Sequence, residues 1–81
     1  MANFQSIQIS VHASKRFSER NIQASDVTAA VSNPDKRTRQ RMGANGGISY
    51  LYFKKCESGG LYVVAEVKAG EAFIVTAWWE S

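Results

Sequence analysis

The chain has 81 residues, of which 44% are hydrophobic and 21% charged, and its formal net charge is +3. Such a chain is expected to form one domain, residues 1–81, around a single core. No apolar run is long enough to cross a bilayer and no secretory signal opens the chain, so we expect a cytoplasmic protein without a membrane partner. The single cysteine, Cys56, excludes an internal disulfide and has no partner at zinc-ligand spacing.

The positive charge is concentrated in the N-terminal half of the chain. Residues 1–41 contain seven Lys or Arg and three acidic residues, whereas residues 42–81 contain three and four. This asymmetry favours a polyanion such as RNA, or an acidic protein, as the partner. An ordinary solvated basic surface is the alternative, because the total charge is small.

The first predicted elements are a short extended segment and a helix. Residues 1–10 alternate weakly between polar and apolar side chains, which is typical of an edge strand or an extended lead-in. Ser10 is a suitable N-cap for a helix over residues 11–20. Asn21 can end this helix, because asparagine tolerates the left-handed conformation of a C-cap residue.

A second, shorter helix is expected next. Ser25 and Asp26 provide an N-cap and a first-turn acid, and apolar residues then recur at helical spacing. Asn33 and Pro34 stop the pattern, because proline cannot continue a helix. The two helices together predict a helical hairpin whose apolar stripes cover another layer of the fold.

Strands are predicted after Asp35. Arg37, Arg39 and Arg41 alternate with other polar residues, so in an extended chain the three arginines would share one side. The segments ISYLYF, LYVVAEV and AFIVTAWW follow, separated by the hairpin compositions ESGG and KAGE. The expected fold class is therefore α+β, with two N-terminal helices packed on a twisted antiparallel sheet of three to four strands.

A candidate for chemistry lies on the first helix. His12, Arg16 and Arg20 recur every fourth residue, which stacks them on one face of a helix. An imidazole can accept and donate a proton near neutral pH, and guanidinium groups match phosphate oxygens bidentately. The set is typical of phosphate chemistry, although a surface helix with ordinary basic residues carries the same spacing.

Other enzyme classes are disfavoured. A metal-dependent nuclease needs clustered carboxylates, whereas those of this chain are spread over different elements, so we expect neither a metal nor another cofactor. A Ser or Cys hydrolase is disfavoured because no nucleophile-elbow motif occurs and Cys56 falls in a turn composition. The strand aromatics are best explained by packing, yet a sheet face carrying Tyr and Trp could also stack bases.

Two segments carry a family resemblance. The stretch HASKRFSERNIQASDVTAAVSNP resembles the opening of a widespread bacterial family of domains of unknown function. Its pattern has His-Ala, an Arg four residues after the His, and a second Arg four residues later before Gly-Ile, where this chain has Asn21. The segment FIVTAWW is similar to the family's last strand, where a Thr precedes an aromatic residue by two positions. The family is similar in turn to the superfamily of barnase, EndoU, colicin-type and RelE-type ribonucleases.

The resemblance implies a RelE-like or barnase-like fold and a toxin-like endoribonuclease that works without a metal ion. Its matching positions are His12 as general acid or base, Arg16 and Arg20 as groups that grip the scissile phosphate, and Thr76 as a group that positions the phosphate or the 2′-hydroxyl. Lys68, at a strand end, is a weaker catalytic candidate.

The expected substrate is tRNA or mRNA, cleaved by attack of its own 2′-hydroxyl, and the expected partner is a cognate antitoxin or immunity protein. Arg37, Arg39 and Arg41 are the candidate RNA-binding residues, because they would follow the RNA backbone. The alternative function is a non-catalytic nucleic-acid-binding or regulatory module that docks an acidic partner through its basic face. The sequence leaves the oligomeric state open.

Overall fold

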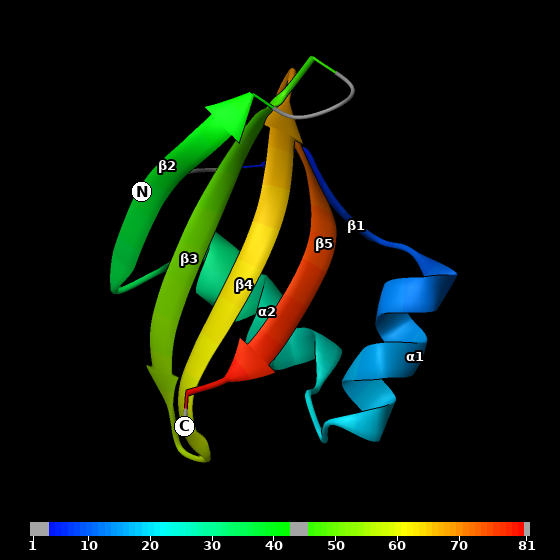
Figure 1. The fold of residues 1–81 in the computed structure, drawn as a ribbon, viewed down its shortest axis with the longest axis vertical. Helices are drawn as coiled ribbons and strands as arrows, with labels where there is room; N and C mark the ends of the chain where they lie inside the picture. The colour runs from blue at the N-terminus through cyan, green and yellow to red at the C-terminus, as the bar shows by residue number, and fades with distance from the viewer. Residues whose placement is uncertain (1–3, 43–45, 81) are drawn as a thin grey trace.

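The computed structural model of the chain describes residues 4–42 and 46–80. Over these residues the chain forms two short helices and a five-stranded sheet that curves around one of the helices (Figure 1). The elements in chain order are β1 (Ser6–Ile9), α1 (Val11–Glu19), α2 (Ala24–Ser32), β2 (Lys36–Met42), β3 (Ile48–Cys56), β4 (Gly59–Lys68) and β5 (Glu71–Trp79).

The strands are ordered β1-β5-β4-β3-β2 in a mixed sheet. From β2 to β5 the strands form an antiparallel meander, whereas β1 pairs in parallel with the first half of β5, from Ser6 opposite Glu71 to Ile9 opposite Ile74. The overall mixture is α+β, but the expected antiparallel sheet of three to four strands is wrong. The sheet has five strands, because a strand is added at each edge of the three apolar ones, and one of these edge strands, β1, is parallel to its neighbour.

Both edge strands give weak sequence signals for a physical reason. Every residue of β2 is exposed, so no apolar alternation identifies it. β1 has only four residues, and it satisfies backbone groups along the free edge of β5, a partner that follows it by more than sixty positions in the chain. Side-chain patterns encode burial, and neither edge strand buries a complete face.

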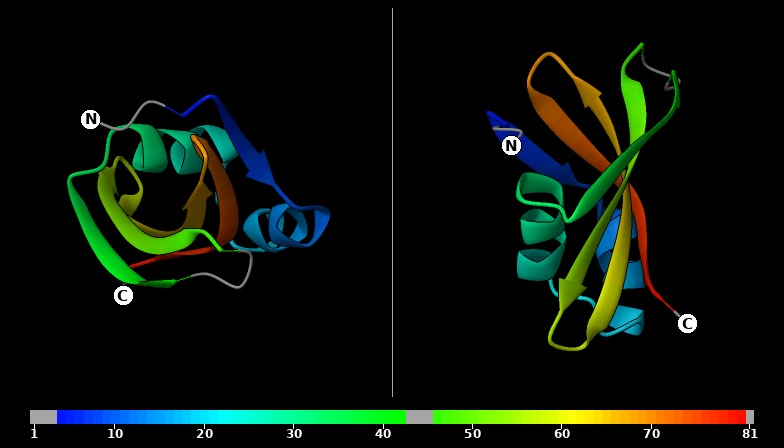
Figure 2. Two further views of the ribbon diagram at one scale, coloured as in Figure 1. Left: turned by 90° about the horizontal axis from the view of Figure 1, so that it is seen from above. Right: turned by 90° about the vertical axis from the view of Figure 1, so that its left-hand side faces the viewer.

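The helices take different positions relative to the sheet (Figure 2). α2 covers β3 and β4 from behind, whereas α1 lies beside the second half of β5, below the part of that edge that β1 occupies. The face of the sheet away from α2 is therefore not covered by either helix. The buried core lies between α2, α1 and the other face, and it consists of Ala13, Phe17, Ile22, Val27, Ala30, Val31, Tyr52, Leu61, Val63, Ala65, Ala72, Ile74 and Ala77.

The caps of α1 agree with the prediction. The Ser10 side chain accepts a hydrogen bond from the Ala13 amide at 3.0 Å, and Asn21 has a φ of 57°. The Ile22 amide then donates to the Phe17 carbonyl at 2.8 Å, which folds the buried Ile22 side chain back onto the last turn. Within the described residues, 4–42 and 46–80, no helix is long and apolar enough to span a membrane.

The start of α2 differs from the prediction. The helix begins at Ala24 with Gln23 as the N-cap residue, and no side chain caps it. The expected N-cap, Ser25, lies inside the first turn, where its hydroxyl donates to the Gln23 side chain at 3.5 Å. The predicted end is correct, because Asn33 is the C-cap.

Candidate functional site

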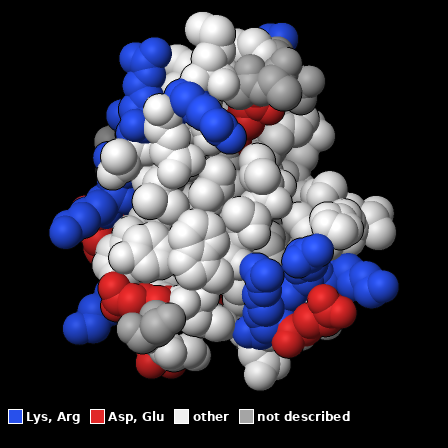
Figure 3. Space-filling model, in the orientation of Figure 1, with Lys and Arg blue, Asp and Glu red and all other residues white. Residues whose placement is uncertain are grey.

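The face of the sheet away from α2, called the open face here, has an uncharged centre between two basic margins. Figure 3 shows basic side chains gathered over β2 on one side and over α1 on the other. Three large apolar side chains of β5 on this face are partly exposed, Phe73 and Trp78 at 38% and Val75 at 56%. Exposed apolar surface in a small domain indicates that part of this face is a candidate binding surface.

Three aromatic residues cross the open face in one row. Phe53 on β3 is directly opposite Tyr62 on β4, and Tyr62 is directly opposite Trp78 on β5. The Phe53 and Tyr62 ring centroids are 4.9 Å apart, and those of Tyr62 and Trp78 are 5.5 Å apart with an interplanar angle of 18°. We call Phe53, Tyr62 and Trp78 the aromatic row.

The first two residues of the candidate catalytic group meet on α1. Arg16 Nε donates a hydrogen bond to His12 Nε2 at 3.2 Å, and both side chains are exposed. In this contact Nε2 is the acceptor, so the hydrogen bond uses a lone pair of the imidazole that could also take up a proton. His12 and Arg16 line a shallow depression of about 310 Å³ together with Lys15 and Glu19.

Arg20 has a different environment from Arg16. Its Nη1 donates to the Ala77 carbonyl of β5 at 2.8 Å, and the Trp79 indole Nε1 donates to the Arg20 carbonyl at 2.9 Å. These two hydrogen bonds fasten the C-terminal end of α1 to the end of β5. The guanidinium of Arg20 is thus engaged with backbone and does not extend into the depression beside His12.

Thr76 lies on the part of β5 that α1 flanks. The chain enters α1 just after Ile9, which pairs with Ile74, and leaves it at Arg20, which holds Ala77. Thr76 is between these two points, and it pairs with Val64 on the open face. The topology therefore brings α1 and Thr76 to the same region of the molecule.

Lys68 does not join this group. It pairs with Glu71 at the beginning of β5, five positions before Thr76. At the rise of an extended strand these positions are roughly 15 Å apart. Lys68 belongs to the opposite end of the sheet, where its Nζ lies near Gly46.

The three arginines of β2 do not share one side, contrary to the prediction. The register shifts between Arg39 and Arg41, so that Gln40 is an extra residue in a β-bulge. Arg37 pairs with Tyr52 on the helix-side face, and its guanidinium lies 4.7 Å from the ring centroid of Tyr50. Arg39 lies on that face too, opposite Tyr50, whereas Arg41 lies on the open face opposite Ser49.

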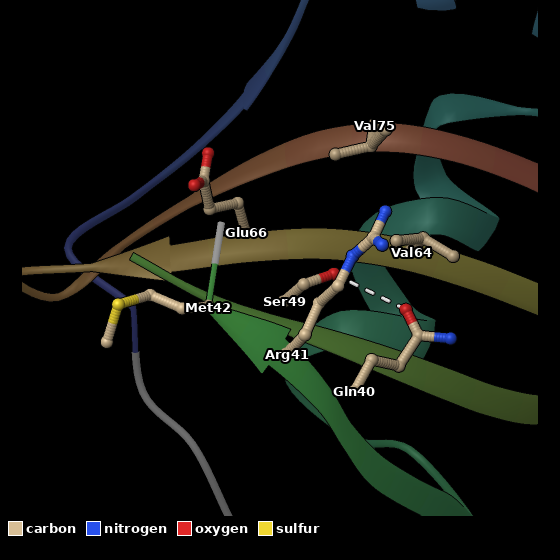
Figure 4. A pocket seen from close by; sticks show the side chains of 7 residues that line it. All are labelled: Gln40, Arg41, Met42, Ser49, Val64, Glu66 and Val75. Carbon is tan, nitrogen blue, oxygen red and sulfur yellow. Dashed lines mark hydrogen bonds between the residues drawn. The ribbon is translucent and has the colours of Figure 1, made fainter. Parts of the chain in front are cut away.

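A second bulge faces the first one across the sheet. The β4–β5 register shifts so that Val75 is the extra residue, and a depression of about 510 Å³ extends between the two bulges (Figure 4). In it, the Ser49 hydroxyl donates to Gln40 Oε1 at 3.3 Å. The residues that line this depression are Gln40, Arg41, Met42, Ser49, Val64, Glu66 and Val75.

Sequence reasoning missed two acidic residues of these depressions. Glu19 follows Lys15 by four positions and Arg16 by three, so helical spacing places it beside them and would have identified it. Glu66 is 8% exposed, and among the described residues it is the buried charged residue. The sequence could have pointed to Glu66, because it is the one carboxylate inside the apolar segment LYVVAEV.

Two side chains whose pKa is raised lie away from α1. Burial raises the pKa of Tyr52, and Arg37 opposes the shift through its charge and through a weak contact with the hydroxyl. Among the described residues, no group meets hydrogen-bond geometry at this enclosed hydroxyl. Burial also raises the pKa of Cys56, and the negative charge of Asp26 adds to the effect. Within residues 4–42 and 46–80, no three His, Cys, Asp or Glu side chains are grouped so that they could hold a metal ion.

The comparison with known families is informative over most of the chain. Residues 9–79, which include α1, α2 and the whole meander, match the model of a family described as a domain of unknown function, DUF4258. No curated protein and no solved structure matches the chain. The match covers far more than half of the sequence, so the chain belongs to the DUF4258 family of domains of unknown function.

Proposed function

We propose that this domain is an endoribonuclease of the toxin type that cleaves RNA without a metal ion. The observation that carries the proposal is the hydrogen bond between Arg16 and His12, a base next to a phosphate-binding group, at the margin of an open face that bears exposed aromatic rings. The family resemblance to the barnase, EndoU, colicin-type and RelE-type superfamily supports the same function. In this proposal the protein acts in the cytoplasm on tRNA or mRNA and is controlled by an antitoxin or immunity protein.

The acceptor position of His12 Nε2 suits the first step of the reaction. When a phosphate enters, Arg16 turns from His12 Nε2 to the phosphate oxygens, which a guanidinium binds more strongly because they are charged. The freed Nε2 then removes the proton of the 2′-hydroxyl, and the 2′-oxygen attacks phosphorus. The bond to the 5′-oxygen breaks, this oxygen takes a proton from water, and a 2′,3′-cyclic phosphate remains.

Other candidate residues receive narrower roles in this proposal. Thr76 supplies a hydroxyl on the part of β5 that α1 flanks, where it can hydrogen-bond a phosphate oxygen or the 2′-hydroxyl. Arg20 is a positioning residue, because its contact with the Ala77 carbonyl holds α1 against β5. Lys68 has no part in the reaction, since it lies at the other end of the sheet.

The test is cleavage of single-stranded RNA by the purified protein in EDTA, with identification of the product ends. We expect cyclic phosphate ends from the wild type and a loss of about 10²- to 10⁴-fold in rate for His12→Ala. Lys15→Ala is the matched control, because Lys15 lines the same depression and has no role in the mechanism. Intact RNA at high protein concentration, or equal rates for wild type and His12→Ala, would contradict the proposal.

A second candidate function is a non-catalytic module that binds RNA or an acidic partner through the same basic surfaces. The exposure of His12 on the helix surface, in a shallow depression, favours this alternative. In that case the wild type binds without cleaving, His12→Ala retains its affinity, and Arg41→Ala weakens binding through the loss of a cation on the open face.

A further inference from the structure

The aromatic row continues into a basic residue at each side of the sheet. On β2, Lys36 is directly opposite Phe53, and the two line one depression of about 150 Å³ together with Tyr62 and the acidic Glu80. On the other side, Trp78 is the residue between Ala77 and Trp79, and both of these bond to Arg20 at the end of α1. Across the strands, the order is therefore the cation of Lys36, the three rings of the aromatic row and then the basic helix α1.

The rings are fixed in place by contacts within the sheet. Phe53 lies over Gly60, where a side chain would not fit, because a Cβ on Gly60 would be 2.6 Å from Phe53 Cε1. The Tyr62 hydroxyl donates to Glu80 Oε2 at 3.3 Å. Trp78 stacks on Tyr62 and keeps 38% of its surface exposed, so part of the indole remains accessible to a ligand.

We propose that the aromatic row is a stacking surface for the bases of single-stranded RNA, whose backbone runs across the strands from Lys36 toward α1. This inference rests on the proposed function, since it takes RNA as the ligand. Aromatic rings stack with any base, and flanking cations neutralise the backbone phosphates on both sides. The aromatic row crosses three strands and therefore spans roughly 10 Å at ordinary strand spacing. This length allows more than one base to contact a ring.

The geometry selects single strands over duplexes. In a double helix the bases are stacked on each other and only their edges are accessible, so they cannot stack on the exposed part of Trp78. A strand held on the row would enter the region of His12 and Arg16 from the side of Trp78, because Arg20 joins the end of α1 to the residues on both sides of Trp78. The row would thus deliver an unpaired nucleotide to the proposed site.

The experiment measures binding without cleavage. The probe is a short fluorescent RNA of mixed sequence in which every 2′-hydroxyl is methylated, so that it lacks the nucleophile. Its dissociation constant is measured by anisotropy for the wild type, for Trp78→Leu and for Phe73→Leu. Phe73 is the matched control, because it lies on the open face of the same strand with the same exposure of 38% but outside the aromatic row.

We expect Trp78→Leu to weaken binding of the single strand about tenfold, and Phe73→Leu to change it less than twofold. The duplex of the same probe should bind more weakly than the single strand. Circular dichroism and thermal unfolding verify that both variants are folded, and Tyr62→Leu provides a second variant within the row.

Equal effects of the Trp78 and Phe73 substitutions, or tighter binding of the duplex, would overturn the inference. So would a concentration-dependent dimer that Trp78→Leu abolishes while leaving RNA binding unchanged, because the row would then be an interface between two copies of the chain. The result is independent of the cleavage test, since a protein can bind the methylated strand through Trp78 whether or not it cuts an unmodified one.

Discussion

Arg20 and Arg16 offer a comparison between an arginine that bonds to β5 and one that bonds to a neighbouring residue of its own helix. The two residues are one helical turn apart, and both lie near the C-terminal end of α1. Replacement of either by methionine removes one positive charge while keeping a long side chain of similar helix propensity. The difference between the two variants therefore reports the Arg20 contact with Ala77, because the loss of charge near the helix end is common to both.

The expected difference follows from the hydrogen bonds. A hydrogen bond to a charged group contributes about 1.5–3 kcal/mol when protected from water, but the Arg20 side chain is exposed, so we expect about 1 kcal/mol from its 2.8 Å bond to the Ala77 carbonyl. The Arg16 bond to His12 joins two exposed side chains and should contribute less than about 0.5 kcal/mol. For a domain of this size, 1 kcal/mol corresponds to a change in Tm of about 4–8 °C.

The assay is urea unfolding followed by circular dichroism and tryptophan fluorescence. The Trp79 indole donates to the Arg20 carbonyl, so its emission reports whether the end of α1 stays on β5. We expect Arg20→Met to lower the free energy of unfolding by about 1 kcal/mol more than Arg16→Met does. Equal stabilities of the two variants would refute the positioning role of Arg20 and return it to the candidates for phosphate binding.

Two further predictions concern single residues. Tyr52→Phe should raise the free energy of unfolding by about 1 kcal/mol, because the variant no longer encloses a hydroxyl without a partner. Burial raises the pKa of Tyr52 above its usual value of 10.0, so in the wild type the unfolded chain loses this proton first and stability falls as the pH rises above about 10. The advantage of Tyr52→Phe should therefore grow in that range, and a destabilised variant at neutral pH would indicate that Arg37 bonds the hydroxyl. Asn21→Ala should cost about 1 kcal/mol in urea unfolding because the residue has a φ of 57°, whereas Asn21→Gly should be close to neutral, and equal losses for the two would exclude backbone strain as the cause.

The local features of the fold were predictable where a few adjacent residues decide the conformation. The start and end of α1 depend on Ser10 and Asn21, whose cap conformations involve only neighbouring residues. The meander was predictable from three apolar segments separated by turn compositions. The start of α2 was not, because Ser25 is a good N-cap by residue type, yet the N-cap residue is Gln23, two positions earlier, and no side chain caps the helix.

The candidate site was predictable only in part. Helical spacing correctly indicated that His12 and Arg16 are neighbours. The same spacing could not show that the Arg20 guanidinium bonds to a strand that begins more than fifty positions later. Strict alternation placed three arginines of β2 on one side, and the bulge at Gln40 moves Arg41 to the other face.

By itself the sequence determined the class of the fold, the caps of α1 and the chemistry available on that helix, because these depend on composition and on residues within a few positions of each other. Only the tertiary structure decided which strands pair at the edges, where the two bulges lie and which arginine of α1 bonds to β5. Those outcomes depend on backbone hydrogen bonds between segments far apart in the chain, and side-chain patterns do not encode them. The aromatic row is the clearest instance, since Phe53, Tyr62 and Trp78 become one surface only through the register of three strands.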